Sequence, residues 1–171
     1  MRKYEFYKEL FFIPMINFIY KLYDYFTSTT IKYYSANTEF SLSKAHTSDA
    51  CFDLQSNADF TVRSDSEELI STGIYLDLPK NWEAQIRSRS GLAKNHGVHV
   101  LNSPGTIDSG YKGELKVIIR NNRLVDFNIK KGERIAQIKF EKVPKVRLIN
   151  LKEQINSLSD RGAKGFGSSG A

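Results

Sequence analysis

Short β-type runs that recur about every ten residues are the feature that most restricts the fold of this 171-residue chain. Each run is rich in β-branched and aromatic residues or alternates apolar with polar side chains, as half-buried strands do. The predicted strands are Ile31–Tyr34, Glu39–Leu42, Phe60–Arg63, Gly73–Leu78, Glu83–Arg87, Val98–Leu101, Leu115–Ile119, Val125–Ile129, Arg134–Phe140 and Val146–Leu151. Because turn formers recur between these runs, we expect an all-β antiparallel sandwich or barrel of the jelly-roll kind.

One short helix is expected inside this β body, over Ser90–Asn95 and ending before Gly97. Ser90 is a favourable N-cap, so free backbone N–H groups and the positive end of the helix dipole would gather there. Arg87 and Arg89 lie just upstream. The segment is therefore either a phosphate-binding site or an ordinary capped helical turn.

The two ends of the chain differ from the body. Residues 1–29 contain an apolar run, Leu10–Tyr20, which is too short to span a bilayer as a helix and is interrupted by Pro14. Three interpretations stay open for this extension: a helix packed on the body, an interfacial helix that binds a membrane or protein partner, and a poorly ordered leader. The other end, residues 159–171, is rich in glycine and serine and predicts a flexible arm. Residues 30–158 form the predicted β domain.

Composition limits the classes of function. The single cysteine, Cys51, excludes an internal disulfide, which indicates a reducing, intracellular location. His46, His96 and His99 lack metal-ligand spacing. The net charge of +6 is spread along the chain and forms no strip of basic and aromatic residues. A solvated basic surface, or one that attracts small polyanions such as nucleotides, is therefore favoured over one that binds nucleic acid.

The stretch from Asn102 to Glu114 holds the candidate catalytic acid. Turn-forming residues surround a short apolar pair and one carboxylate, Asp108. Such an acid is either a solvated turn former or a group that faces a cavity. Glycine and proline let the backbone approach a flat ligand closely, and Tyr111 can pack against a ring.

The glycine-rich arm carries one aromatic residue, Phe166. An arm of this kind is either a simple terminus or a segment that closes over a ligand. In the second case Phe166 covers a flat ring, while Arg161, Ser168, Ser169 and glycine N–H groups bind phosphate oxygens.

Together these stretches resemble the trimeric dUTP pyrophosphatase (dUTPase) family, which is described by five ordered motifs. The matching segments are Asp49–Leu54, Arg89–Ala93, Gly105–Glu114 with Asn102 before it, Gly132–Gln137 and Arg161–Gly170. Each motif is weak alone, but five in order with family-like spacing give a strong resemblance over Thr30 to the C-terminus. It implies a distorted jelly-roll β-barrel.

Four residues depart from the family pattern. Cys51 stands where the family usually has glycine, and Ser88 where it usually has proline. Gly110 occupies a position often held by aspartate, and Lys164 one often held by glycine. None of them removes a group that the chemistry needs, although Lys164 could change how readily the arm closes.

The resemblance implies hydrolysis of dUTP to dUMP and pyrophosphate with Mg²⁺, which limits uracil incorporation into DNA and supplies dUMP for dTMP synthesis. Asp108 is the implied general base for the water that attacks the α-phosphorus. Tyr111 would exclude a 2′-hydroxyl, and the hairpin would read the uracil edge and exclude a 5-methyl group. The implied base and sugar contacts are Asn102, Gly105, Thr106, Ile107, Tyr111 and Phe166.

The remaining implied groups act on the triphosphate and the metal. The phosphate-binding set is Arg89, Ser90, Gly91, Gln137, Arg161, Gly167, Ser168 and Ser169. Asp49, Asp53 and Gln137 would reach Mg²⁺ through water, since Mg²⁺ keeps its waters and favours phosphate oxygen. Family members are homotrimers whose active sites combine residues of all three subunits, and they act in the cytoplasm, or in the nucleus of a eukaryotic or viral host.

Three other functions are weighed against this one. A dCTP deaminase shares the fold, but it uses a glutamate beside an aromatic residue where this chain has Tyr111-Lys112-Gly113. A non-catalytic nucleotide sensor would not need Asp108. Nucleic-acid binding would need a strip of basic and aromatic residues, which this sequence does not contain. The sequence therefore predicts a dUTP hydrolase with no nucleic-acid partner.

Overall fold

The computed structural model describes Phe18, Ile19, Leu22 and residues 28–151. The described residues form ten strands and the short helix α2, and every strand pairing is antiparallel. One sheet has the order β1 (Lys32–Ser35), β4 (Ser66–Asp77), β8 (Glu114–Asn121) and β6 (Val98–Val100). The second has the order β2 (Phe52–Gln55), β10 (Arg134–Lys142), β5 (Trp82–Arg87) and β7 (Gly105–Asp108). A two-stranded ribbon pairs β3 (Phe60–Val62) with β9 (Phe127–Ile129).

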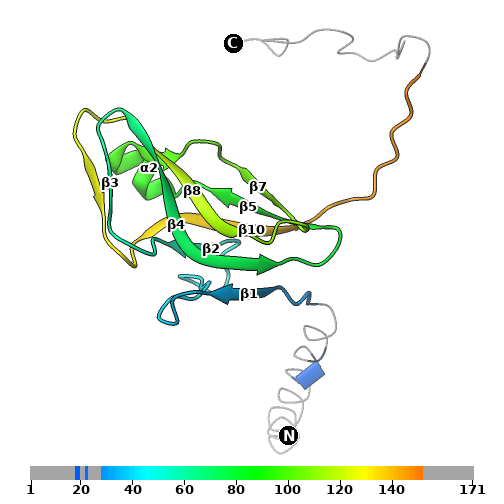
Figure 1. The fold of residues 1–171 in the computed structure, drawn as a ribbon. Coiled ribbons are helices and arrows are strands. Elements are labelled where there is room, and N and C mark those ends of the chain that lie inside the picture. The colour runs from blue at the N-terminus through cyan, green and yellow to red at the C-terminus, as the bar shows by residue number, and fades with distance from the viewer. Residues whose placement is uncertain (1–17, 20–21, 23–27, 152–171) are drawn as a thin grey trace, which may run out of the picture.

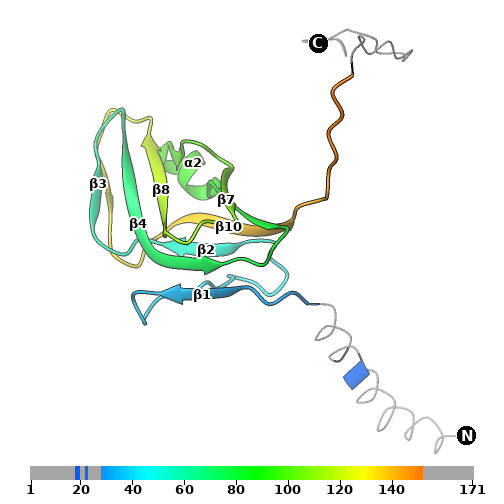
Figure 2. The ribbon, with the colours of Figure 1, turned by 45° about the vertical axis from the view of Figure 1, so that its right-hand side comes forward.

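The two sheets enclose an aliphatic core. In β8 every second side chain is buried, including Leu115, Val117 and Ile119, while the residues between them are at least partly exposed. Ile86 of β5 and Ile138 of β10 belong to the same core. The period of two in the sequence therefore marks the inward face of each sheet. Figures 1 and 2 show β3 at the end of the domain opposite to the point where the chain leaves β10. The predicted all-β, jelly-roll-like fold with one short internal helix is confirmed.

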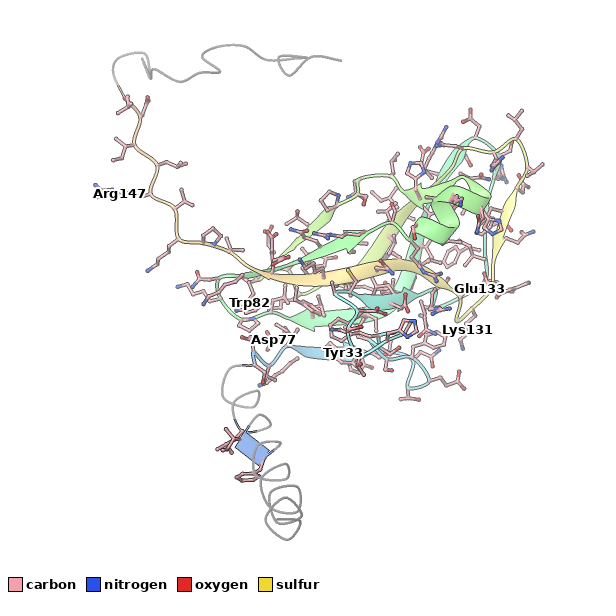
Figure 3. The ribbon with its side chains drawn as sticks, turned by 180° about the vertical axis from the view of Figure 1, so that it is seen from behind. Tyr33, Asp77, Trp82, Lys131, Glu133 and Arg147 are labelled. Atoms are coloured by element: carbon pink, nitrogen blue, oxygen red, sulfur yellow. The ribbon has the colours of Figure 1, made fainter. Side chains whose placement is uncertain are left out.

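Two predicted strands are wrong. Glu39–Leu42 begins in a turn, because the side chain of Asn37 accepts a hydrogen bond from the Glu39 N–H at 3.1 Å and its carbonyl accepts one from the Phe40 N–H at 3.0 Å. Val146–Leu151 has no strand partner within residues 28–151 and is largely exposed, with Leu148 at 90%. Figure 3 shows this segment, marked by Arg147, extending away from the domain.

Two real strands were absent from the prediction, β2 and β7. Both are four residues long and flanked by turn formers, and both gain their pairing from strands distant in sequence. The strand predicted from Val125 begins instead at Phe127. The carbonyl of Val125 accepts a hydrogen bond from the buried Asn121 side chain at 2.8 Å, which holds that residue in the preceding loop.

The helix α2 spans Ser90–His96, close to the predicted range. Its N-cap residue is Arg89 and there is no side-chain cap, so the assignment of Ser90 as N-cap is wrong and Ser90 is the first helical residue. Gly97 ends the helix in the left-handed conformation, with φ of 64°, and its N–H bonds to the Ala93 carbonyl.

Most of the N-terminal extension and the whole C-terminal arm lie outside the described residues, so the predicted boundaries at residues 29 and 159 stay predictions. Within the part of the chain that is described, no helix has the length and apolar character needed to cross a membrane.

Candidate functional site

Asp108 ends strand β7, which lies at the edge of its sheet and pairs with β5. Its side chain is exposed and has no hydrogen-bond or ion-pair partner among the described residues. The carboxylate borders a cavity of about 350 Å³. The lining residues are Leu69, Thr106, Ile107, Asp108, Tyr111, Glu114 and Lys116. The structure thus brings together four of the residues predicted to contact the nucleoside or the attacking water, and it leaves the acid free to accept a proton.

Tyr111 is held in place by its contacts with Gly113 and Glu114. Its hydroxyl donates to the carbonyl of Glu114 at 2.9 Å. Its ring lies over Gly113, where an added Cβ would come within 2.5 Å of the Tyr111 Oη atom. The glycine therefore makes room for the ring, and the ring forms one wall of the cavity.

The loop between β6 and β7 is exposed but is tied to the residues around it. Gly105 is buried, and a Cβ at that position would lie 3.1 Å from the Asn102 Nδ2 atom, so the Asn102 amide covers the glycine. Ser103 Oγ accepts a hydrogen bond from the Ser88 N–H at 3.2 Å. The Ser88 hydroxyl in turn accepts one from the Val100 N–H at 3.0 Å. Ser88, which stands where proline is usual, thus joins the segment before Arg89 to this loop.

A second group of candidate residues surrounds Asp53 on β2. Asp53 is buried, with 9% of the residue exposed. Its carboxylate lies 3.7 Å from Arg89 Nε and 3.3 Å from Arg134 Nη1, and Arg89 also donates to the Arg134 carbonyl at 2.6 Å. Gln137 on β10 lies between Asp53 and Arg87 in the strand register. Arg89 and Arg134 both border a cavity of about 420 Å³ next to α2.

Two of the three candidate metal-contacting residues, Asp49 and Asp53, already bond to other protein groups. Asp53 is committed to two arginines, and Asp49 accepts a hydrogen bond from the His46 N–H at 2.8 Å. Among the described residues there is no group of three or more histidine, cysteine, aspartate or glutamate side chains that could hold a metal ion. The residues therefore do not form a direct ligand cage.

The two groups of candidate residues lie at opposite ends of β5. Asp108 is opposite Glu83 at one end, and Gln137 is opposite Arg87 at the other. Four residues of strand separate these two rows by roughly 13 Å. Figure 3 shows Trp82, which begins β5, well apart from Glu133, which lies just before β10. In the described part of the chain, Asp108 therefore borders one cavity, and Arg89 and Arg134 border another.

Some site residues lie elsewhere or were missed. Ser90 and Gly91 are exposed at the start of α2. Arg161, Phe166, Gly167, Ser168 and Ser169 are outside the described residues. Leu69, Glu114 and Lys116 were not predicted as site residues. Glu114 and Lys116 share one face of β8, which alternation could have revealed, whereas Leu69 reaches the cavity only through the register of β4 with β8.

These observations define a class: a two-sheet, jelly-roll-like β domain with a free acid in a turn-bounded cavity and a separate arginine–carboxylate cluster. The chain belongs to the dUTPase family, whose model, described as "dUTPase", matches residues 40–170. The chain is 48% identical over 126 residues to the deoxyuridine 5′-triphosphate nucleotidohydrolase of Clostridium acetobutylicum, covering 74% of this chain and 86% of that protein. It is also 48% identical to the Clostridium tetani protein of the same name, with the same coverage.

Solved structures agree with this assignment. The dUTPase of Staphylococcus bacteriophage 80alpha, solved with dUPNHPP, matches with a TM-score of 0.76 and 26% identity, covering 84% of this chain and all of that one. A mutant dUTPase from phage phi11 of S. aureus, described with a structural Mg(II) ion, matches with a TM-score of 0.67 over 73% of this chain and 98% of that one. At 19% identity the second likeness supports the fold alone.

Proposed function

We propose that this enzyme hydrolyses dUTP to dUMP and pyrophosphate by an attack of water on the α-phosphorus, with Asp108 as the general base. Membership of the dUTPase family supplies the reaction class: the chain is a dUTP diphosphatase, which converts dUTP to dUMP. The observation that carries the role of Asp108 is its unpaired carboxylate, which faces a cavity instead of bonding to its own turn. A carboxylate in this state can orient a water molecule and accept its proton.

The same cavity supports the proposed selectivity. Tyr111 forms a fixed wall against which a deoxyribose would pack, leaving no space for a 2′-hydroxyl. Asn102, Gly105, Thr106 and Ile107 would receive the uracil edge, since the buried glycine lets backbone approach the base. The arm residue Phe166 would cover the base from the other side.

Arginine and amide groups would bind the triphosphate. Within the described residues the proposed groups are Arg89, Ser90, Gly91 and Gln137. The arm would add Arg161, Gly167, Ser168 and Ser169. Fixed donors of this kind stabilise the charge that develops during phosphoryl transfer. Mg²⁺, when bound, would neutralise triphosphate charge, with Asp49, Asp53 and Gln137 contacting its water shell. Asp53 would also keep Arg89 and Arg134 oriented.

We further propose a homotrimer with shared active sites. The rows that carry Asp108 and Gln137 lie roughly 13 Å apart in one chain, so another subunit would have to complete the site. The segment after β10 is consistent with such an assembly. It leaves the domain with exposed apolar side chains, including Val146, Leu148 and Ile149, which a neighbouring subunit could cover.

The central experiment replaces Asp108 with asparagine. Asp108→Asn removes the proton acceptor and keeps the shape, so binding of a non-hydrolysable dUTP analogue should stay within a fewfold of wild type. Pyrophosphate release should fall by about 10²–10⁴-fold. Asp65→Asn is a matched control, because Asp65 is an exposed acid paired with Arg120 at the other end of the β4–β8 pair. Turnover by Asp108→Asn near the wild-type rate would refute the assignment.

A substrate panel tests the reaction itself. The protein is incubated with Mg²⁺ and each of dUTP, dCTP, UTP and dTTP, and both pyrophosphate and ammonia are measured. Pyrophosphate from dUTP alone is expected, and chelation of Mg²⁺ should slow its release. Ammonia from dCTP would instead support the deaminase alternative.

A further inference from the structure

Strand β4 loses its regular pairing with β8 beside the candidate site. The ladder runs to Ser71 opposite Lys116 and resumes at Tyr75 opposite Glu114, so three residues of β4 face one residue of β8. Gly73, in the middle of this bulge, has φ of +68°. An irregularity of this kind interrupts the ladder and frees backbone groups that then need other partners.

The Glu114 side chain supplies one of those partners, and the Thr72 hydroxyl supplies another by accepting a hydrogen bond from the Ile74 N–H at 3.2 Å. The Oε1 atom of Glu114 accepts a hydrogen bond from the Gly73 N–H at 2.8 Å and another from the Ser71 hydroxyl. Its Oε2 atom lies 3.9 Å from Lys116 Nζ, and only 19% of the side chain is exposed. A carboxylate with this many partners and so little exposure is fixed in one position.

The backbone of the same residue holds the tyrosine. The Glu114 carbonyl accepts the hydrogen bond from Tyr111 Oη at 2.9 Å. Glu114 thus connects two parts of the site. Its side chain accepts hydrogen bonds from the bulge of β4, and its backbone carbonyl accepts one from the tyrosine that lines the cavity. Asp108, Tyr111 and Glu114 all border that cavity.

We propose that Glu114 is a positioning residue for sugar selectivity, which acts by fixing the Tyr111 ring through the start of β8. This inference rests on the proposed role of Tyr111 and adds the residue that enforces it. Without the carboxylate, the backbone of residue 114 keeps its pairing with Tyr75 but loses the side-chain bonds to the bulge, and the ring can move away from the space that a 2′-hydroxyl would occupy. Asp108 lies on a different strand, β7, and keeps its position through pairing with β5.

The test compares Glu114→Ala with Glu114→Gln. The quantity measured is the ratio of kcat/KM for dUTP to kcat/KM for UTP. Alanine removes the oxygen that accepts both hydrogen bonds, so the ratio should fall roughly tenfold, the effect expected from losing one or two hydrogen bonds of ordinary strength. Glutamine keeps an acceptor oxygen for Ser71 and Gly73, so its ratio should stay within about twofold of wild type. The kcat for dUTP should change less than the ratio.

Two further variants keep the result interpretable. Glu67→Ala is the control, because Glu67 lies on the same strand pair and bonds Arg120 at 3.0 Å on an exposed face; its ratio should be unchanged. If Glu114→Ala does not fold, Ser71→Ala removes one of the two donors and should lower the ratio by a smaller factor.

The outcomes separate this inference from the proposed function. If Tyr111→Ala lowers the ratio and folded Glu114→Ala does not, Glu114 is only structural and the inference is overturned. An equal loss in Glu114→Gln and Glu114→Ala would overturn it too, because charge and not hydrogen bonding would then be responsible. If Tyr111→Ala leaves the ratio unchanged, the proposed role of the tyrosine fails first.

Discussion

Gly113→Ala gives the sharpest test of how the cavity wall is built. A Cβ at this position would lie 2.5 Å from Tyr111 Oη, 2.7 Å from Cζ and 3.1 Å from Cε2. The first two distances are too short for any real contact, so the tyrosine ring must move. Gly113 does not have a positive φ, so alanine fits the backbone there without strain.

The expected cost to stability is small and can be worked out. Moving the ring breaks the hydrogen bond from Tyr111 Oη to the Glu114 carbonyl, which is worth about 0.5–1.5 kcal/mol. Alanine offsets part of this loss by reducing the freedom of the unfolded chain, by about 0.4–1 kcal/mol. The free energy of unfolding should therefore change by no more than about 1 kcal/mol, whereas the ratio of kcat/KM for dUTP over UTP should drop clearly.

Urea denaturation and steady-state kinetics on both nucleotides measure the two effects. Gly110→Ala is the matched control, since nothing lies within 4 Å of a Cβ there, and it belongs to the same turn region. The control should leave the selectivity ratio unchanged and raise the free energy of unfolding by about 0.4–1 kcal/mol. Wild-type selectivity in Gly113→Ala would show that the position of the ring does not decide the sugar preference, and the reasoning would be refuted.

Three more predictions concern the stability of the fold and the loop between β6 and β7. Asn121→Ala should cost roughly 3 kcal/mol in urea denaturation, because the buried amide donates to three backbone carbonyls; a loss below about 1 kcal/mol would contradict this. Ser103→Ala should raise KM for dUTP more than it lowers kcat, since it frees the loop that carries the base contacts. Hydrogen bonds lower the pKa of Asp59, chiefly from the Lys131 N–H, and the pKa of Glu141, chiefly from Lys139. Both acids therefore stabilise the fold above their ordinary pKa values of 3.8 and 4.5, and this contribution is lost as pH falls through the lowered values. Denaturation at pH 5 and pH 3 should show a smaller difference in Asp59→Asn than in wild type.

Local pattern predicted most of the sheet but could not predict its irregularities. The alternation in β8 is visible in sequence because its buried residues are all aliphatic or β-branched up to Ile119. The strand β7 was hidden, because its glycine and polar residues resemble a turn and only pairing with β5 makes it extended. Glu39–Leu42 failed for the opposite reason, since the Asn37 side chain bonds the local backbone and favours a turn over a strand.

The site was predicted residue by residue from motifs, while its connections came only from the structure. Asp108 and Tyr111 were expected near a ligand, and both border the same cavity. The partners of Asp53 could not be foreseen, because Arg89 and Arg134 are 36 and 81 positions away and meet it only through the pairing of β10 with β2 and with β5. Glu114 was not predicted because its role depends on the bulge in β4, and the sequence of residues 105–114 contains no signal for a bulge in another strand.

The pairing of β5 with β7 and β10 limits how an active site could be assembled from Asp108 and Gln137. The row of Asp108 and the row of Gln137 are fixed by hydrogen-bonded registers on the two sides of the same strand. Rotation of side chains cannot close a gap of roughly 13 Å between two rows of one sheet, and shortening it would require breaking the ladder. We propose that the Asp108 and the arginine cluster that act on one nucleotide come from different copies of this chain. Two inactive variants, Asp108→Asn and Gln137→Ala, should then recover pyrophosphate release when they are unfolded and refolded together, and mixtures that stay inactive would argue against a shared site.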